Sequence, residues 1–88
     1  MTPQEARIFA AELRTDLPTI DLHGRYPDEA IYALDLFLAD AVLKDSAARV
    51  IYGHGTGKLA ATVLSYLQKS PLVATIIEQG GTCICLFT

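Results

Sequence analysis

A glycine-rich segment between an apolar strand and an amphipathic helix limits the possible folds of this chain more than any other feature. Residues 50–52 (Val-Ile-Tyr) carry no charge, which is typical of a strand buried on both faces. Residues 53–58 (Gly-His-Gly-Thr-Gly-Lys) follow at once, and apolar side chains then recur at helical spacing at Leu59, Val63, Leu64 and Leu67. Strand, loop and helix in this order indicate an α/β unit whose loop lies beyond the carboxyl end of a strand.

The segments on either side of this unit complete the order of elements. A capping-box pattern at residues 2–5 (Thr-Pro-Gln-Glu) predicts a helix that runs to about Arg14. We expect one face of this helix to carry a mainly apolar stripe, with Ile8, Phe9, Glu12 and Leu13. Further elements are expected as a strand at 19–22, a helix at 27–43, and two strands at 73–77 and 82–87.

This order, α-β-α-β-α-β-β, predicts the class of fold. Strand–helix–strand units favour right-handed parallel crossovers, whereas the turn at Gln79-Gly80-Gly81 makes the last two strands antiparallel. We therefore expect an α/β (α+β) two-layer sandwich with a four-stranded mixed sheet. At 88 residues the chain has room for one domain, residues 1–88, with an N-terminal helix at 1–16 and a motif-bearing core at 19–87.

Composition excludes several classes of protein. Hydrophobic residues make up 51% and charged residues 19% of the chain, so it is not disordered. No apolar run approaches the roughly 20 residues of a membrane helix, and no secretory signal opens the chain. We expect a cytoplasmic protein without a membrane partner. Cys83 and Cys85 stand two apart on a predicted strand, a spacing that suits buried apolar side chains better than a disulfide or a zinc site.

Charge is distributed unevenly between the two halves. The net charge is −3, but residues 1–46 hold nine acids against four bases, whereas residues 47–88 hold three bases against Glu78 alone. An acidic protein binds nucleic acid poorly unless the phosphates are held locally. A polyanion would therefore be bound near the loops of the second half.

Two loops of this chain each follow a strand and precede a helix. They are His23-Gly24-Arg25 and Gly53 to Lys58. If the first two strands are parallel neighbours, both loops lie at one edge of the sheet, where ligands of such sheets gather. His23 and His54, the two histidines of the chain, would then face a common site.

The glycine loop has two interpretations. Glycines at alternate positions free successive amides to face an anion at a helix N-terminus, and a side chain at Gly55 would then forbid a positive φ and crowd those amides. Alternatively, the glycines only permit a tight turn between strand and helix. The spacing does not match the Walker A motif, because three residues separate Gly53 from Gly57 and Leu59 replaces the Ser or Thr. We expect neither ATP nor another nucleotide cofactor.

Asp21 and His23 are spaced so that their side chains share one face of a strand. Such a pair can position a water, bind a metal or act in acid–base catalysis. Alternatively, Asp21 caps the turn or pairs with Arg25. Tyr52 offers a phenol at the end of its strand, although a tyrosine there is also typical of packing.

Together these motifs resemble the small MutS-related (Smr) domain family. Residues 20–24 (Ile-Asp-Leu-His-Gly) with Glu29-Ala30 are similar to the family's first motif, Leu-Asp-Leu-His-Gly followed by Glu-Ala. Residues 50–59 are similar to its second motif, a strand ending in His-Gly-x-Gly-x-Gly before a helix. Here Tyr52 stands at the usual histidine, and Ala60 at a position that is often Arg. The resemblance spans residues 19–87.

The resemblance implies nucleic-acid binding and, for many members, endonuclease activity on DNA or RNA, with a divalent metal such as Mg²⁺ or Mn²⁺ in some. By motif position, Asp21 and His23 would be the catalytic pair. Gly53, Gly55 and Gly57 would be the loop at the nucleic-acid phosphate. From their places in the two loops, we expect the other phosphate-binding candidates to be Gly24, Arg25, Tyr52, His54, Thr56 and Lys58. We expect a DNA or RNA partner, structured or branched. The alternatives are a non-catalytic nucleic-acid-binding module and a domain that binds a partner protein.

Overall fold

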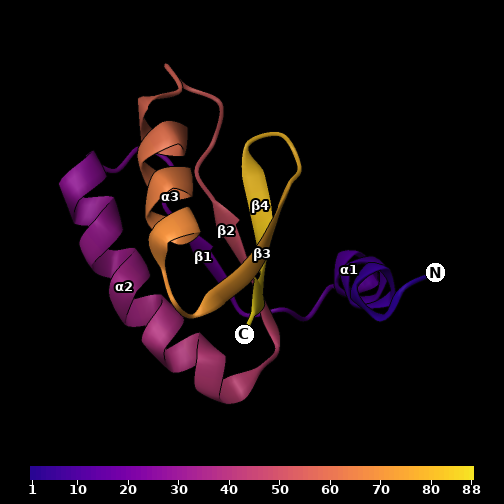
Figure 1. Ribbon diagram of the computed structural model, residues 1–88. Helices are drawn as coiled ribbons and strands as arrows, with labels where there is room; N and C mark the ends of the chain where they lie inside the picture. The colour runs from indigo at the N-terminus through magenta and orange to yellow at the C-terminus, as the bar shows by residue number, and fades with distance from the viewer.

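The computed structural model describes residues 1–88 as three helices and a four-stranded sheet (Figure 1). The elements are α1 (Pro3–Leu13), β1 (Thr19–Asp21), α2 (Pro27–Lys44), β2 (Ala47–Ile51), α3 (Lys58–Lys69), β3 (Val73–Glu78) and β4 (Thr82–Phe87). Their order is the predicted α-β-α-β-α-β-β. No helix is both long and apolar enough to cross a lipid bilayer.

The sheet is mixed, with strand order β1-β2-β4-β3. β1 runs parallel to β2, with Ile20 opposite Val50, and α2 forms the crossover between them. β4 lies between β2 and β3 and pairs antiparallel with both. β3 is therefore an edge strand that runs in the same direction as β2. Both predicted relationships, parallel crossovers and an antiparallel final hairpin, are confirmed.

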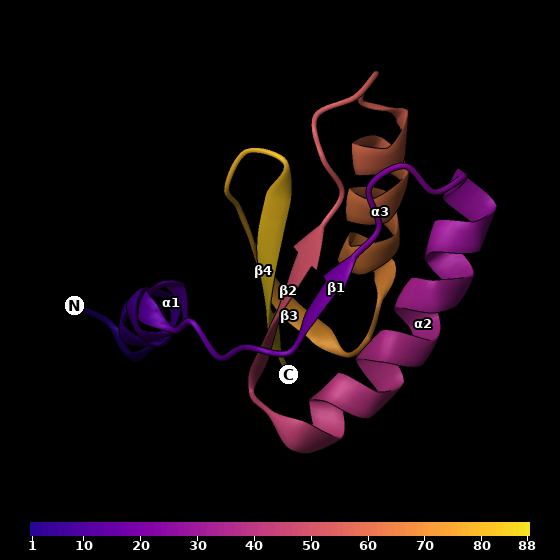
Figure 2. The same ribbon diagram turned by 180° about the vertical axis from the view of Figure 1, so that it is seen from behind.

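Helices cover both faces of the sheet, which Figures 1 and 2 show from opposite sides. α2 and α3 pack together on one face, and α1 lies on the other. β4 divides its side chains between the two cores: Cys83, Cys85 and Phe87 join the larger cluster under α2 and α3, whereas Ile84 and Leu86 join a smaller one with Ala11 of α1. Alternation along one strand thus builds both cores. Cys83 and Cys85 are free and buried, as predicted.

α1 begins as predicted but buries only part of the expected face. Thr2 Oγ1 accepts the Glu5 amide at 3.1 Å, and the Glu5 carboxylate accepts the Thr2 amide at 3.2 Å, which completes the capping box. The expected stripe is wrong in detail: Phe9 is 55% exposed and Leu13 67% exposed, while Ala11 is buried. Ile8 is half-buried against the smaller cluster, as expected. The small methyl of Ala11 lets the helix backbone approach the sheet, and Phe9 and Leu13 point away from it.

The end of α1 is connected to the end of α2 by a bidentate ion pair. Arg14 Nη1 and Nη2 lie 2.6 and 2.7 Å from the two carboxylate oxygens of Asp45, the C-cap residue of α2. Arg14 Nε also donates to Asp16, at 2.9 Å. Two parallel hydrogen bonds fix the orientation of the guanidinium as well as its distance. This contact joins residues 31 positions apart and holds α1 against the rest of the domain.

β2 starts three residues earlier than predicted, at Ala47, and ends at Ile51. Ala47 and Ala48 are buried on opposite faces of the sheet, in the smaller and the larger cluster respectively. Alanines carry no strong strand signal, which is why the pattern did not include them. Tyr52 therefore lies one residue beyond the strand, at the start of the glycine loop.

Candidate functional site

The loops that follow β1 and β2 meet at one edge of the sheet and enclose a groove of about 390 Å³. Because β1 and β2 are parallel neighbours, their carboxyl ends lie side by side. His23 and His54 both line the groove, as the sequence predicted. The other lining residues are Gly24, Arg25, Tyr26, Tyr52, Gly53, Gly55, Thr56, Gly57, Leu59 and Ala60.

The two loops are in direct contact at Gly53. Its φ is +79°, and a Cβ placed there would lie 3.2 Å from the Cβ of His23. Gly53 is therefore needed both for its backbone conformation and for the close approach of the His23 loop. Gly55 differs from the prediction, because its φ is not positive and a Cβ there would meet nothing within 4 Å.

Asp21 and His23 form a hydrogen-bonded pair at the rim of the groove. His23 Nδ1 lies 2.6 Å from Asp21 Oδ1, and the His23 amide donates to the same oxygen at 3.1 Å. The side-chain hydrogen bond from His23, followed by the one from its amide, lowers the pKa of Asp21 below its ordinary value. A carboxylate facing Nδ1 favours the tautomer that carries its proton there, which leaves the lone pair of Nε2 free. The predicted alternative, Asp21 as a turn cap, describes the same contact with the His23 amide.

The amides of the glycine loop fall into two groups, those bonded within the chain and those left unpaired. The amides of Tyr52 and Gly53 both donate to the carbonyl of Gly81, at 3.0 and 2.8 Å, so they hold the loop to the β3–β4 turn. The amides of residues 55–57 and of Leu59 and Ala60 make no hydrogen bond within the chain. α3 has Gly57 as its N-cap and no side chain that caps it. Unpaired amides at a helix N-terminus form a place where an anion is stabilised.

The imidazole of His54 lies against the β3–β4 turn, at the surface of the molecule. A Cβ on Gly81 would lie 2.8 Å from His54 Nε2, and one on Gly80 would lie 3.7 Å from His54 Cε1. Figure 1 shows the β3–β4 turn and the loop before α3 at the same end of the molecule. The imidazole of His54 is thus supported by a strand pair that lies outside both sequence motifs.

Tyr52 lines the groove but belongs mainly to the core. Its side chain is buried within the larger cluster, and its hydroxyl donates to the carbonyl of Thr82 at 3.1 Å. Burial, reinforced by nearby Cys83 and Glu78, raises the pKa of Tyr52 to about 12. A neutral phenol bonded to a carbonyl does not act as an acid or base near neutral pH. The packing interpretation of this tyrosine agrees with its surroundings.

Of the two predicted phosphate-binding cations, Arg25 and Lys58, only Arg25 lines the groove. Arg25 lines the groove and makes no side-chain hydrogen bond or ion pair, so its guanidinium is free for a ligand. Lys58, the first residue of α3, lies outside the lining of the groove. Arg25 is therefore the one fully charged side chain inside it.

The chain groups too few ligating side chains to enclose a metal ion by itself. No group of three or more His, Cys, Asp or Glu side chains is placed to hold an ion. Asp21 is the carboxylate beside the groove, and its Oδ1 already accepts two hydrogen bonds from His23. The residues present thus do not fit a resident metal held by several protein ligands.

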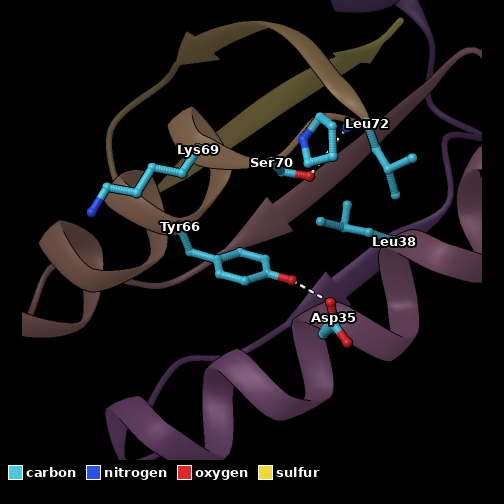
Figure 3. Close-up of a pocket in the computed structure, with 7 residues that line it drawn as sticks. Asp35, Leu38, Tyr66, Lys69, Ser70 and Leu72 are labelled. Atoms are coloured by element: carbon cyan, nitrogen blue, oxygen red, sulfur yellow. Dashed lines mark hydrogen bonds between the residues drawn. The ribbon is translucent and has the colours of Figure 1, made fainter.

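A second hollow, of about 300 Å³, lies between α2 and α3 near the carboxyl end of α3 (Figure 3). The Tyr66 hydroxyl donates to Asp35 across the two helices, and the side chain of Lys69 extends away from this contact. Burial and the hydrogen bond to Asp35 raise the pKa of Tyr66 to about 12. This hydrogen bond connects α2 to α3 near the end of α3 that lies opposite the groove.

The two sequence motifs meet in one groove on a mixed α/β sheet, where a glycine loop with unpaired amides lies beside a histidine–carboxylate pair. These features together define a class of small domain. The model of the Smr domain family matches residues 20–83, and the chain belongs to this family. It is 36% identical over 90 residues to a protein of Clostridium perfringens named Endonuclease MutS2, covering 92% of this chain and 12% of that protein. A Fusobacterium nucleatum protein of the same name is 44% identical over 55 residues, covering 61% of this chain and 7% of its own length. The chain thus spans a small part of these relatives.

Solved structures confirm the fold. The Smr domain of Thermus thermophilus MutS2 superimposes with a TM-score of 0.77 at 24% identity, covering 82% of this chain and 99% of that domain. The Smr domain of B3BP gives a TM-score of 0.69 at 21% identity over 94% of this chain and 88% of that one. The predicted mixed α/β fold is therefore confirmed by these structures, and the predicted family by the match of its model.

Sequence reasoning missed four residues of this region. Tyr26, Leu59 and Ala60 line the groove, and Gly81 lies against the imidazole of His54. The position of Tyr26 between Arg25 and a helix-opening proline is the sequence signal that could have placed it in the groove. No local signal marks Gly81 as a partner of His54, because the two are 27 positions apart and meet only when β4 pairs with β2.

Proposed function

We propose that this domain binds the sugar–phosphate backbone of DNA or RNA in the groove and hydrolyses a phosphodiester there. One observation carries the proposal: unpaired amides at the start of α3 and the free guanidinium of Arg25 line the same groove as His23, whose Nδ1 is held by Asp21. Membership of the Smr family supports it, as does the name endonuclease borne by the similar MutS2 proteins. Structured or branched nucleic acid is the proposed partner.

Binding begins with one phosphate at the glycine loop. Its oxygens accept hydrogen bonds from the unpaired amides of residues 55–57 and of Leu59 and Ala60, with the positive end of the α3 dipole behind them. Arg25 provides a bidentate contact from the opposite loop. Gly24, Tyr52, Gly53 and His54 shape the walls, and Lys58 adds a point charge outside the groove.

Hydrolysis uses the Asp21–His23 pair. Asp21 accepts a hydrogen bond from Nδ1–H of His23 and so orients the ring. Nε2 then takes a proton from a water that attacks phosphorus. A water oxygen–phosphorus bond forms while the bond to the leaving oxygen breaks, and the imidazolium then returns a proton to the departing alkoxide. The loop amides and Arg25 stabilise the charge that develops on the phosphoryl oxygens. No step in this scheme passes through a metal; a divalent ion such as Mg²⁺ or Mn²⁺ is proposed only as a companion of the nucleic-acid phosphates.

The test is cleavage of supercoiled plasmid and of structured RNA by the pure protein, with Mg²⁺, with Mn²⁺ and with a chelator. We expect the wild type to nick, and His23→Ala and Asp21→Asn to lose about 10²–10⁴-fold in rate while binding within a few-fold of wild type. His54→Gln serves as a matched variant at the other histidine of the groove. If both His23→Ala and Asp21→Asn cleave at the wild-type rate, the catalytic assignment is wrong.

A second candidate is a module that binds nucleic acid without cleaving it. The observation in its favour is Tyr52, which stands where the family motif usually has histidine and donates its hydroxyl to Thr82. Binding by a wild type that cleaves neither substrate under any of the three conditions would support this candidate. In that case Tyr52→His is the variant to examine for a gain of nicking.

A further inference from the structure

An exposed aromatic side chain stands at the mouth of the groove. Tyr26 is the N-cap residue of α2, lines the groove beside Arg25, and is 75% exposed. Its ring belongs to neither hydrophobic cluster, and its hydroxyl makes no hydrogen bond within the chain. The fold therefore gives this ring no packing role.

The other three tyrosines differ from Tyr26. The hydroxyls of Tyr52 and Tyr66 are bonded to Thr82 and Asp35. Tyr32 is 71% exposed but lines none of the hollows of the molecule. Only Tyr26 combines an open ring face with a place in the groove, which makes Tyr32 a matched control for it.

The backbone holds Tyr26 in a fixed place. Its φ and ψ are −69° and 147°, the extended conformation that a following proline favours, and its carbonyl accepts the Ala30 amide at 2.9 Å. The side chain thus projects from the rigid start of an 18-residue helix. Because the backbone is already fixed, only the two side-chain torsions of Tyr26 lose conformational freedom when a flat partner covers the ring.

We propose that Tyr26 is a stacking platform for an unpaired base next to the bound phosphate, and that the site therefore selects single-stranded segments: loops, ends or overhangs. This inference rests on the proposed nucleic-acid function. Contacts to phosphate carry no information about the base, whereas stacking on an aromatic ring requires a base whose face is uncovered. Inside a duplex both faces of a base are covered by its neighbours, so only an unpaired nucleotide offers one.

The test compares affinity for a single-stranded oligonucleotide, the same strand in a full duplex, and the same single strand with one abasic position at its centre. Tyr26→Ala is expected to weaken single-strand binding by about 5- to 150-fold, the range of one base–aromatic stack, and to leave duplex binding within two-fold. Tyr26→Phe keeps the ring and the affinity, and Tyr32→Ala binds as the wild type. The abasic site weakens wild-type binding but not that of Tyr26→Ala.

The outcomes separate this inference from the function on which it rests. If the wild type binds no nucleic acid, the proposed function fails. If the wild type binds, the stacking role is overturned when Tyr26→Ala changes single-strand and duplex affinity by the same factor. It is also overturned when Tyr26→Ala changes neither affinity. A loss that Tyr26→Phe shares with Tyr26→Ala also overturns it, because the phenylalanine ring stacks as well as the tyrosine ring.

Discussion

The imidazole of His54 lies against the backbone of Gly81, so close that a Cβ on Gly81 would stand 2.8 Å from His54 Nε2. The contact joins the glycine loop to the β3–β4 turn, whose Gly81 carbonyl also accepts the amides of Tyr52 and Gly53. The position of the loop, and with it the direction of its unpaired amides, therefore depends on a hairpin at the other end of the chain.

Gly81→Ala is expected to displace His54 and weaken nucleic-acid binding, whereas Gly80→Ala does not. Both glycines have a positive φ, so both substitutions destabilise the fold by about 1–2 kcal/mol through backbone strain. Only at Gly81 does the added carbon collide with the His54 ring, since the distance at Gly80 is an ordinary 3.7 Å. Urea denaturation and binding are measured for both variants. Equal binding losses would show that the His54 contact does not position the loop.

Gly53→Ala is expected to harm the site more than Gly55→Ala, although the sequence pointed to Gly55 as the position where a side chain would crowd the loop amides. At Gly53 an added carbon meets the Cβ of His23 at 3.2 Å with φ at +79°, whereas at Gly55 the space is open and φ is not positive. We expect Gly53→Ala to destabilise the domain by about 1–2 kcal/mol and to slow cleavage by moving His23. Gly55→Ala should stay within about 0.5 kcal/mol of wild type. Greater damage at Gly55 would mean that its amide adopts another conformation with ligand bound.

Nucleic-acid binding is expected to weaken with salt along a shallow log–log slope of about −2 to −4, because few cations reach the ligand. Arg25→Ala should reduce the magnitude of this slope by about one unit, since Arg25 lies in the groove. Lys58→Ala should reduce it less, because Lys58 lies outside the lining. Titrations at several salt concentrations measure both. A larger effect at Lys58 than at Arg25 would place the phosphates along α3 instead of in the groove.

The Arg14–Asp45 ion pair predicts a pH dependence of stability. The side-chain hydrogen bond from Arg14 lowers the pKa of Asp45 from 3.8 to about 2. Because the folded-state pKa is lowered, the contribution is fully present above pH 3.8 and is lost as the pH falls toward 2. The free energy of unfolding of Asp45→Asn should therefore be lower than that of wild type at pH 7, and the two should converge near pH 2.

Asp16→Asn is the matched control for this ion pair. The same arginine lowers the pKa of Asp16, but the side chain of Asp16 is 76% exposed against 16% for Asp45, so solvent screens its contact. We expect a smaller change than for Asp45→Asn at every pH. A difference between wild type and Asp45→Asn that persists unchanged at pH 2 would show that the ion pair is not its source.

Elements defined by local signals could be predicted from the sequence alone. The capping box of α1, the glycine turn before β4 and the helical spacing of α2 act over a few residues, so their physics is contained in short segments. The shared edge of the two loops followed from the parallel crossover, which is a general rule of chain geometry. This rule predicts a common site for His23 and His54, and both line the groove.

Contacts between distant segments were decided by the tertiary structure. Nothing near Ala11 signals that it, and not Phe9 or Leu13, faces the sheet, because this depends on the side chains that β4 presents. The Arg14–Asp45 pair and the support of His54 by Gly81 join residues 31 and 27 positions apart. A sequence shows which groups are able to interact. Which of them do so is settled only when the strands pair and bring their neighbours within a few ångströms of each other.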